Sequence, residues 1–337
     1  MRVIVFGATG TVGAYACLHL KAQGMDVVAT GRRQDDGGFF QAHGISYVPA
    51  DVCQRQQLER LPQEDVYGIV HLAGMLPARM SGYRPQVYID TNMTGTLNIL
   101  EYAARLQVQC VVGSQSIADV DYLCGSTAPI PADVESRFPL DNDHSVYSIT
   151  KTAAANLVQH YAHHCGFRHY MLRFPNIYLY HPNPYYYVDG KPRMQGYRQL
   201  IYRAISGEPI EIWGNPQRRR DMVYVKDCVQ IIALCLTHDH AHSGYYNVGT
   251  GIGTTLEEQV RGIVSVFSPD GHPSPILYRP EKADAAEYVF DISKTRRELG
   301  YTPRYGYLDY LEDFRREMHE QRFARLWGTE QDYLKQP

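Results

Sequence analysis

Gly7-Ala8-Thr9-Gly10-Thr11-Val12-Gly13 follows the apolar run Val3-Ile4-Val5-Phe6 and leads into a helical pattern. Glycines let the backbone turn tightly and let a diphosphate approach a helix N-terminus, where free N–H groups and the helix dipole favour negative charge. The spacing is Gly-x-x-Gly-x-x-Gly, not the more general Gly-x-Gly-x-x-Gly. With a strand before it and a helix after it, this turn predicts a dinucleotide site. The residues predicted to line it are Gly7, Thr9, Gly10, Thr11, Val12 and Gly13.

Beyond this turn, short β-branched runs alternate with longer helical patterns as far as about residue 176. Such alternation predicts βαβ units and a parallel sheet, and continuous apolar strands indicate that helices cover both faces. The predicted strands are 3–6, 27–30, 45–50, 68–73, 108–113 and 170–174. The predicted helices are 12–23, 54–61, 91–106 and 147–164.

The alternation weakens in the second half of the chain. A Tyr/Pro-rich stretch, 178–192, predicts a long loop, and Arg218-Arg219-Arg220 predicts a basic loop. Short strands are expected at 210–213 and 223–225. Helices are expected at 196–206, 227–236, 293–299 and 308–326, with a further one opened by the capping box of Thr255 and Glu258.

The predicted fold class is therefore α/β, a Rossmann-type doubly wound parallel sheet with a smaller C-terminal α+β substrate domain. The expected dinucleotide-binding domain comprises residues 1–177 and 221–250, and the expected substrate domain comprises 178–220 and 251–337.

Composition limits the class of protein. The 337 residues are 44% hydrophobic and 20% charged with a net charge of −3, an ordinary globular balance that favours neither nucleic acid nor an anionic membrane as partner. No apolar run approaches the roughly 18–20 residues that span a bilayer. The first strand begins directly after Met1 with no signal-peptide pattern, and the seven cysteines form no Cys-x-x-Cys pair. We therefore expect a cytoplasmic protein.

Arg32 and Arg33 follow the second predicted strand, where an NAD site usually carries Asp or Glu for the ribose hydroxyl. Residues 28–33 contain no carboxylate, and an arginine fork matches a phosphate. The sequence therefore favours NADP as cofactor, with NAD as the alternative. Asp51 and Val52, after the third strand, are expected near the adenine ring.

Tyr147 and Lys151 lie four residues apart, on one face of a predicted helix. An ammonium near a phenol stabilises the phenolate, and a tyrosine tuned in this way can act as general acid and base. Tyr-x-x-x-Lys is common by chance, but here it follows a dinucleotide-binding turn. We therefore predict that Tyr147 and Lys151 are catalytic.

With these motifs the sequence resembles the extended short-chain dehydrogenase/reductase family, in its nucleotide-sugar epimerase/dehydratase branch. The resemblance covers nearly the whole chain. Besides the turn and the Tyr147 helix, the matching segments are His71-Leu72-Ala73-Gly74, Thr91-Asn92-x-x-Gly95-Thr96-x-Asn98, Arg173-Phe174-Pro175-Asn176-Ile177-Tyr178, Arg220-Asp221-Met222-Val223-Tyr224-Val225-Lys226-Asp227, Asn247-Val248-Gly249 and Arg279-Pro280.

The resemblance implies roles for these residues. Tyr147 would be the acid/base, and Lys151 would bind the nicotinamide ribose and lower the pKa of Tyr147. A third catalytic residue is expected among Ser114, Gln115 and Ser116, because a gapless match places Gln115 at the family's Ser/Thr position. The further residues implied for the cofactor are Leu72, Ala73, Gly74, Asn92, Gly113, Phe174, Pro175, Asn176 and Ile177. Those implied for a nucleotide-diphosphate sugar are Met75, Gln115, Asn176, Tyr178, Arg220 and Arg279.

Several reactions remain open at this stage. The family's 4,6-dehydratases carry an Asp-Glu pair just after the Ser/Thr, and no such pair occurs here, which disfavours dehydration. A nucleotide-sugar epimerase acting at C4 is favoured, with an NADPH-dependent 4-ketoreductase as the alternative. A non-catalytic dinucleotide-binding regulator is less favoured, because Tyr147 and Lys151 are intact. The family also implies a homodimer formed through the 91–106 and 147–164 helices.

Two other clusters each allow two interpretations. His238-Asp239-His240-Ala241-His242 could hold a metal, but a solvated loop is the favoured interpretation, and no metal is expected. Tyr178, Tyr180, Tyr185, Tyr186 and Tyr187 could line a sugar pocket or an ordered surface loop.

Overall fold

A seven-stranded parallel sheet forms the centre of the molecule, as the sequence predicts. The structure, a computed structural model, describes residues 1–142, 144–188 and 190–334. The strands are β1 (Arg2–Phe6), β2 (Asp26–Gly31), β3 (Ser46–Pro49), β4 (Gly68–His71), β5 (Cys110–Ser116), β6 (Arg168–Phe174) and β13 (Gly244–Asn247). Their order is β13-β6-β5-β4-β1-β2-β3, and every neighbouring pair is parallel. The chain thus winds outward from β1 in both directions, which confirms the doubly wound α/β class.

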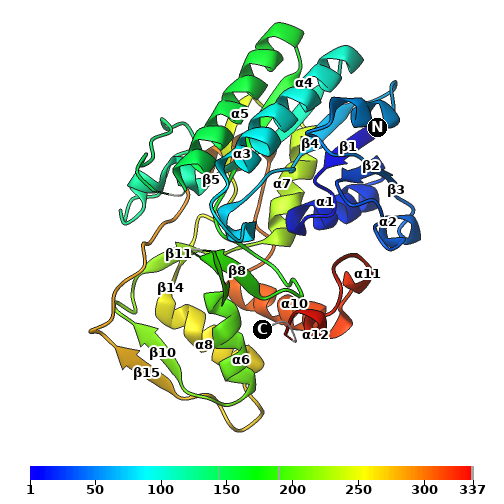
Figure 1. Cartoon of the computed structure of the whole chain (residues 1–337). Helices are drawn as coiled ribbons and strands as arrows, with labels where there is room; N and C mark the ends of the chain where they lie inside the picture. The colour runs from blue at the N-terminus through cyan, green and yellow to red at the C-terminus, as the bar shows by residue number, and fades with distance from the viewer. Residues whose placement is uncertain (143, 189, 335–337) are drawn as a thin grey trace.

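Helices cover both faces of the sheet (Figure 1). Val3 and Val5 of β1 pack into a core with α1 (Thr11–Ala22) and α7 (Val225–Thr237). Ile4 and Phe6 point to the other face and pack with α4 (Gly95–Leu106) and α5 (Ser145–Cys165). Because side chains alternate along a strand, the unbroken apolar run of β1 supplies both cores.

The second half of the chain adds a smaller lobe below the sheet in Figure 1. We use "smaller lobe" for two strand pairs and two helices. They are the parallel pair β10 (Ile210–Trp213) and β15 (Ile276–Arg279), the antiparallel pair β11 (Arg219–Asp221) and β14 (Gly253–Thr255), and the helices α6 (Gly196–Ile205) and α8 (Leu256–Phe267). Thr255 and Glu258 form the expected capping box of α8.

The remaining elements connect or flank these two parts. They are α2 (Phe39–Ala42), α3 (Pro85–Tyr88), the pair β7 (Ile177–Tyr178) and β12 (Val223–Tyr224), α9 (Ser293–Leu299), α10 (Tyr307–Glu320), α11 (Ala324–Trp327) and α12 (Glu330–Leu334). Within the described residues, no helix is long and apolar enough to cross a membrane.

Several local predictions were wrong. The stretch 178–192 is not one loop, because β8 (Tyr185–Val188) and β9 (Lys191–Met194) pair as an antiparallel hairpin. The basic triplet is not a loop either, since Arg219 and Arg220 lie in β11. The predicted helix at 54–61 is a 3₁₀ turn, Arg55–Arg60.

Two predicted helices also differ in detail. A π-helical turn, Ile89–Thr94, precedes α4, so the 91–106 helix is not uniform. The predicted final helix, 308–326, is interrupted at Gln321, whose φ of 43° lies in the left-handed region, and the chain resumes as α11. A left-handed residue ends an α-helix, because the backbone can no longer continue the hydrogen-bond ladder.

Candidate active site

The glycine-rich turn joins β1 to α1, and the first turn of α1 has no side-chain cap. The N-cap of α1 is Gly10, and no side chain caps the helix there. The first N–H groups of a helix have no intrahelical partner, so this end is available to an anion. Gly7 and Gly13 make the turn possible. A Cβ on Gly7 would lie 2.6 Å from the nitrogen of Ala73, and one on Gly13 would lie 2.1 Å from the carbonyl oxygen of Gly7. The turn therefore fits a dinucleotide diphosphate.

Arg32 and Arg33 lie at the end of β2, but they are not equivalent. Both are exposed, and the guanidinium of Arg33 donates to the carbonyl of Leu326 near the C-terminus. The next two carboxylates along the chain bind N–H groups of their own loop: Asp35 accepts from that of Gly37 at 2.8 Å, and Asp36 accepts from that of Phe40 at 2.7 Å. Of these charged groups, Arg32 is the one whose side chain makes no described hydrogen bond.

The carboxyl ends of β3 and β4 carry the next group of predicted cofactor residues. Leu72, Ala73 and Gly74 follow β4 directly, and Asp51 and Val52 follow β3. The side chain of Asp51 accepts from the N–H of Cys53 at 3.0 Å, and Val52 packs against Gly95 at the start of α4.

Asn92 has a bracing role. Its side-chain oxygen accepts from the N–H of Met75 at 2.8 Å, and its amide donates to the carbonyl of Met75 and to the hydroxyl of Thr150. The buried amide therefore ties the loop after β4 to α5.

The catalytic candidates meet where β5 ends beside α5. Lys151 donates from Nζ to the Ser114 hydroxyl at 3.0 Å, and the Ser116 side chain lies close enough to the Tyr147 phenol to lower its pKa. Gln115 lies between these serines in the strand, so its side chain points to the opposite face. There its side-chain oxygen accepts from the N–H of Ser116 at 2.9 Å. Of the three alternatives, only Ser116 contacts the Tyr147 phenol.

Burial dominates the electrostatics of this site. Burial lowers the pKa of Lys151 to about 8, although the nearby Asp119 carboxylate raises it. Burial raises the pKa of Tyr147, and the nearby Ser116 hydroxyl offsets this rise only in part. The protein groups alone therefore raise the pKa of Tyr147, whereas the sequence predicted that Lys151 would lower it.

Two buried groups beneath the site were not predicted to take part. Arg173 forms a two-pronged ion pair with Asp119, at 2.8 and 3.0 Å, and both side chains are fully buried. Arg173 belongs to a motif noted in the sequence, whereas nothing local to Asp119 signals the pair.

The imidazole of His71, at the end of β4, lies 2.8 Å from the hydroxyl of Thr96 through Nε2. Burial and the Lys151 charge lower its pKa to about 3, so His71 is neutral.

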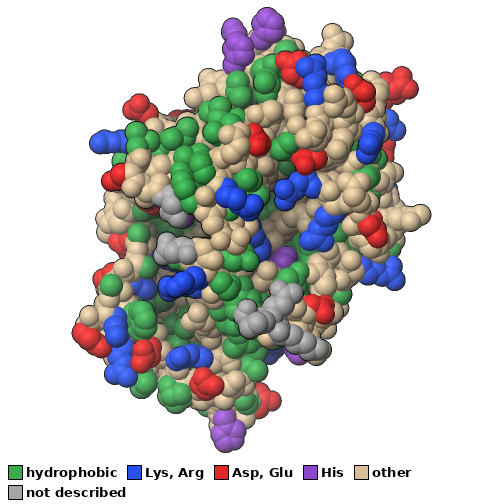
Figure 2. Space-filling model, viewed as in Figure 1, with side chains coloured by type: hydrophobic (Ala, Val, Ile, Leu, Met, Phe, Trp, Pro, Cys, Tyr) green, Lys and Arg blue, Asp and Glu red, His purple; other side chains and the backbone are tan. Residues whose placement is uncertain are grey.

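The residues expected to bind substrate lie at the junction with the smaller lobe. Phe174 ends β6, Pro175 and Asn176 follow it, and Ile177 and Tyr178 form β7. Tyr178 is buried, and Arg220 of β11 lies close enough to its phenol to lower the pKa that burial raises. Arg220 also donates from Nε to the carbonyl of Ala286 at 3.1 Å. On the face shown in Figure 2, Lys and Arg side chains gather around a hollow between the two parts of the molecule.

Arg279 lies elsewhere in the smaller lobe. Its guanidinium is bound to Glu211 of the adjacent strand at 3.0 Å, and no described contact joins it to Arg220. Tyr180 is buried in the core, unlike a residue that lines an open pocket.

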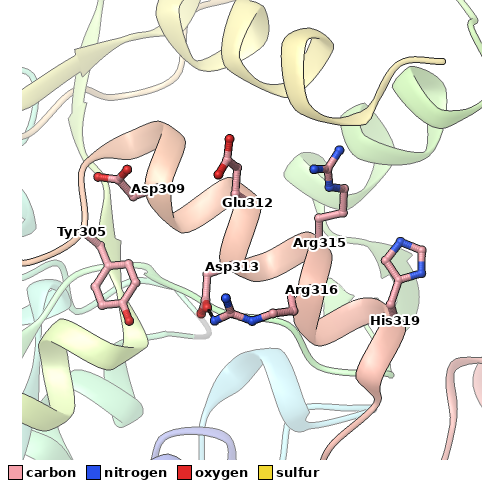
Figure 3. Close-up of a pocket in the computed structure, with 7 residues that line it drawn as sticks. All are labelled: Tyr305, Asp309, Glu312, Asp313, Arg315, Arg316 and His319. Carbon is pink, nitrogen blue, oxygen red and sulfur yellow. Dashed lines mark ion pairs between the residues drawn. The ribbon is translucent and has the colours of Figure 1, made fainter. Parts of the chain in front are cut away.

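A separate hollow of about 420 Å³ lies on α10, and Tyr147, Lys151 and Ser116 take no part in lining it (Figure 3). Its lining residues are Tyr305, Asp309, Glu312, Asp313, Arg315, Arg316 and His319. Asp313 is already paired with Arg316 and Lys226.

Comparison with known proteins agrees with the geometry. The model of the family described as "NAD dependent epimerase/dehydratase family" matches residues 3–249. A UDP-glucose 4-epimerase of Rhizobium meliloti is 26% identical over 328 residues, covering 90% of this chain and 93% of that protein.

Two solved structures share the fold over nearly the whole chain. The UDP-glucose 4-epimerase of Thermotoga maritima with UDP-glucose has a TM-score of 0.75 at 21% identity, covering 95% of this chain and 99% of that one. The UDP-glucose 4-epimerase of Thermus thermophilus in complex with NAD has a TM-score of 0.70 at 21% identity, covering 93% of this chain and 97% of that one.

Proposed function

The chain belongs to the NAD dependent epimerase/dehydratase family, and we propose that it is a nucleotide-sugar epimerase that inverts one sugar carbon, C4. The observation that carries the proposal is the contact of Tyr147 with Ser116 beside Lys151, at the sheet edge where the glycine-rich turn also lies. In doubly wound sheets, ligands bind at this carboxyl edge. The UDP-glucose 4-epimerase relatives support a UDP-hexose as substrate.

The chain's own residues divide the work of proton transfer. The Tyr147 phenolate takes the proton of the reacting sugar hydroxyl and returns it after inversion. The Ser116 hydroxyl, beside the Tyr147 phenol, orients the sugar oxygen. The Lys151 ammonium, held by Ser114, supplies a positive charge and a donor for the ribose. A bound oxidised nicotinamide supplies the reversible hydride acceptor and a positive charge that lowers the pKa of a nearby phenol.

The surroundings of Ser116 argue against dehydration. Ile117 and Ala118 follow it, and the first carboxylate along the chain is Asp119. Both Asp119 oxygens are bound to the buried Arg173. A carboxylate held in this way is not free to move a proton at a neighbouring sugar carbon.

A 4-ketoreductase is the second candidate, because it would use the same residues and consume one NADPH in each turnover. The absence of a ribose-binding carboxylate after β2 favours NADP, and NAD in the Thermus relative keeps NAD as the alternative. The seven unpaired cysteines suit the cytoplasm. We also propose a homodimer formed through α4 and α5.

The test is to incubate the purified chain with UDP-glucose, UDP-N-acetylglucosamine or UDP-glucuronic acid and follow the sugar by NMR. We expect inversion at C4 with no net change in absorbance at 340 nm, and no inversion by Tyr147→Phe, which should still bind dinucleotide. Stoichiometric loss of NADPH with a 4-keto sugar would instead identify a reductase. No reaction with any of these sugars in either assay would refute the proposal.

A further inference from the structure

The last described residues reach back to the glycine-rich turn. The indole of Trp327 donates from Nε1 to the carbonyl of Thr9 at 3.0 Å. The N–H of the same Thr9–Gly10 peptide donates to the carbonyl of Gly7 at 2.9 Å. The C=O and the N–H of this peptide are therefore both hydrogen-bonded, which fixes the orientation of the peptide plane. This peptide directly precedes the first N–H groups of α1.

A close-packed aromatic group holds Trp327 in place. The ring of Phe323 lies 4.3 Å from that of Trp327, 4.6 Å from that of Tyr15 in α1 and 5.3 Å from that of Phe39 in α2. Phe323 and Trp327 are each 3% exposed. Beside them, Arg33 donates to the carbonyl of Leu326. The segment therefore contacts the turn, α1 and the loop after β2 at once.

The far end of the same segment is fastened to the smaller lobe. In α12, the Glu330 carboxylate accepts from Arg198 and Tyr202 of α6. Arg198 is fully buried, so its charge depends on this partner. The His181 ring lies 4.5 Å from Trp327. Residues 321–334 thus form a strap that runs from α10 through α11, beside α1, to α12 (Figure 1).

We propose that this strap retains the dinucleotide, and that Trp327 is a positioning residue for the diphosphate-binding turn. Trp327 sets the Thr9–Gly10 peptide so that the first N–H groups of α1 face the diphosphate, while Glu330 keeps the strap closed from the other lobe. The inference rests on the proposed function, because a redox-neutral epimerase recycles its dinucleotide and gains from slow release. Binding and strap closure are reciprocal: a bound dinucleotide also stabilises the strap.

The experiment uses NADH and NADPH as probes, because their own fluorescence reports binding in every variant. Their dissociation is timed by a chase with excess NAD⁺ or NADP⁺ from wild type, Trp327→Phe and Glu330→Gln. Trp213→Phe is the matched control, because Trp213 is the other tryptophan and is 49% exposed on β10. We expect about fivefold faster release from Trp327→Phe, as for loss of one ordinary hydrogen bond. Release should be faster than wild type from Glu330→Gln and unchanged from Trp213→Phe.

Hydrogen exchange supplies a second readout if Trp327→Phe is poorly folded. In wild type, dinucleotide should slow amide exchange in peptides covering 321–334, and Glu330→Gln should weaken this protection. Release rates within twofold of wild type in both strap variants, or no protection of the strap, would overturn the proposal. No sugar nucleotide is present, so a wrong sugar reaction leaves this test intact. If the strap variants release dinucleotide as slowly as wild type but C4 inversion is normal, only the proposed role of the strap is refuted.

Discussion

Ser116 and Ser114 serve different partners, although they lie two residues apart on one side of β5. Ser116 contacts the Tyr147 phenol, whereas Ser114 accepts from Lys151. We expect Ser116→Ala to lower kcat by about 10²-fold, within the range for loss of one transition-state hydrogen-bond donor, with dinucleotide affinity unchanged. Ser114→Ala should mainly weaken dinucleotide binding. Steady-state kinetics and cofactor titration of both variants separate these roles, and the reverse pattern would contradict the assignment.

Lys151 gives the site a pH dependence. With its pKa lowered by burial to about 8, the ammonium is lost as pH rises through that value, so dinucleotide affinity should fall between pH 7 and 9. Titrations across this range should show the step in wild type, and Lys151→Met should bind weakly without it.

The same pKa shift makes the opposite prediction for stability. The unfolded chain, with its usual pKa of 10.5, binds more protons than the folded chain above pH 8. This group therefore adds stability as pH rises from about 8 to 10.5. Chemical denaturation of Lys151→Met should lack that contribution, and an equal pH slope in both proteins would count against a depressed Lys151 pKa.

Arg32 is the residue that should decide between the two cofactors. Arg33 is held by the strap, whereas the Arg32 guanidinium is exposed and makes no described hydrogen bond. We expect Arg32→Ala to weaken NADP⁺ binding by about 10–100-fold, the range for a charge-assisted contact with phosphate, and NAD⁺ binding by less than about twofold. Calorimetric titration with both cofactors tests this. If wild type prefers NAD⁺ and Arg32→Ala leaves that preference unchanged, the cofactor is NAD and the role assigned to Arg32 is wrong.

At the scale of elements, the turn between β1 and α1 has no room for a side chain at Gly7 or Gly13. We expect Gly13→Ala to push the start of α1 away from the turn, because its Cβ would lie 2.1 Å from the Gly7 carbonyl oxygen. Dinucleotide affinity should then fall by at least about tenfold, since the diphosphate depends on those N–H groups. Gly196→Ala at the start of α6 is the control, because a Cβ there meets nothing within 4 Å. Equal affinity in the two variants would show that the turn adapts.

The sheet was predictable from sequence because burial on both faces leaves strands as unbroken apolar runs. β1, β2 and β6 lie within about two residues of their predicted bounds for that reason. The β8–β9 hairpin was not predicted, because Tyr and Pro residues indicated a loop although Tyr185 to Val188 suit a strand. The contact of Ser116, rather than Gln115, with Tyr147 depends on which side of β5 each residue faces. The sequence alone does not show which of these residues faces Tyr147.

At the scale of the whole molecule, the strap shows what local patterns miss. Trp327 and Thr9 are 318 residues apart in the sequence and meet because the fold brings α11 beside the turn that follows β1. The strap contacts the glycine-rich turn through Trp327 and α6 through Glu330, so it connects the two parts of the molecule directly.

The proposed dimer belongs to the same scale. Leu97 of α4 is 38% exposed and Ile149 of α5 is 42% exposed, on neighbouring helices that cover one face of the sheet. Burial of such side chains between two copies removes apolar surface from water, and a carboxylate placed among them would have to be desolvated. Leu97→Asp should therefore shift the protein from dimer to monomer in light scattering after size exclusion. Leu140→Asp, at a residue 74% exposed in a loop, is the control and should leave the dimer intact. A monomeric wild type, or a dimer that survives Leu97→Asp, would place any self-association on another face.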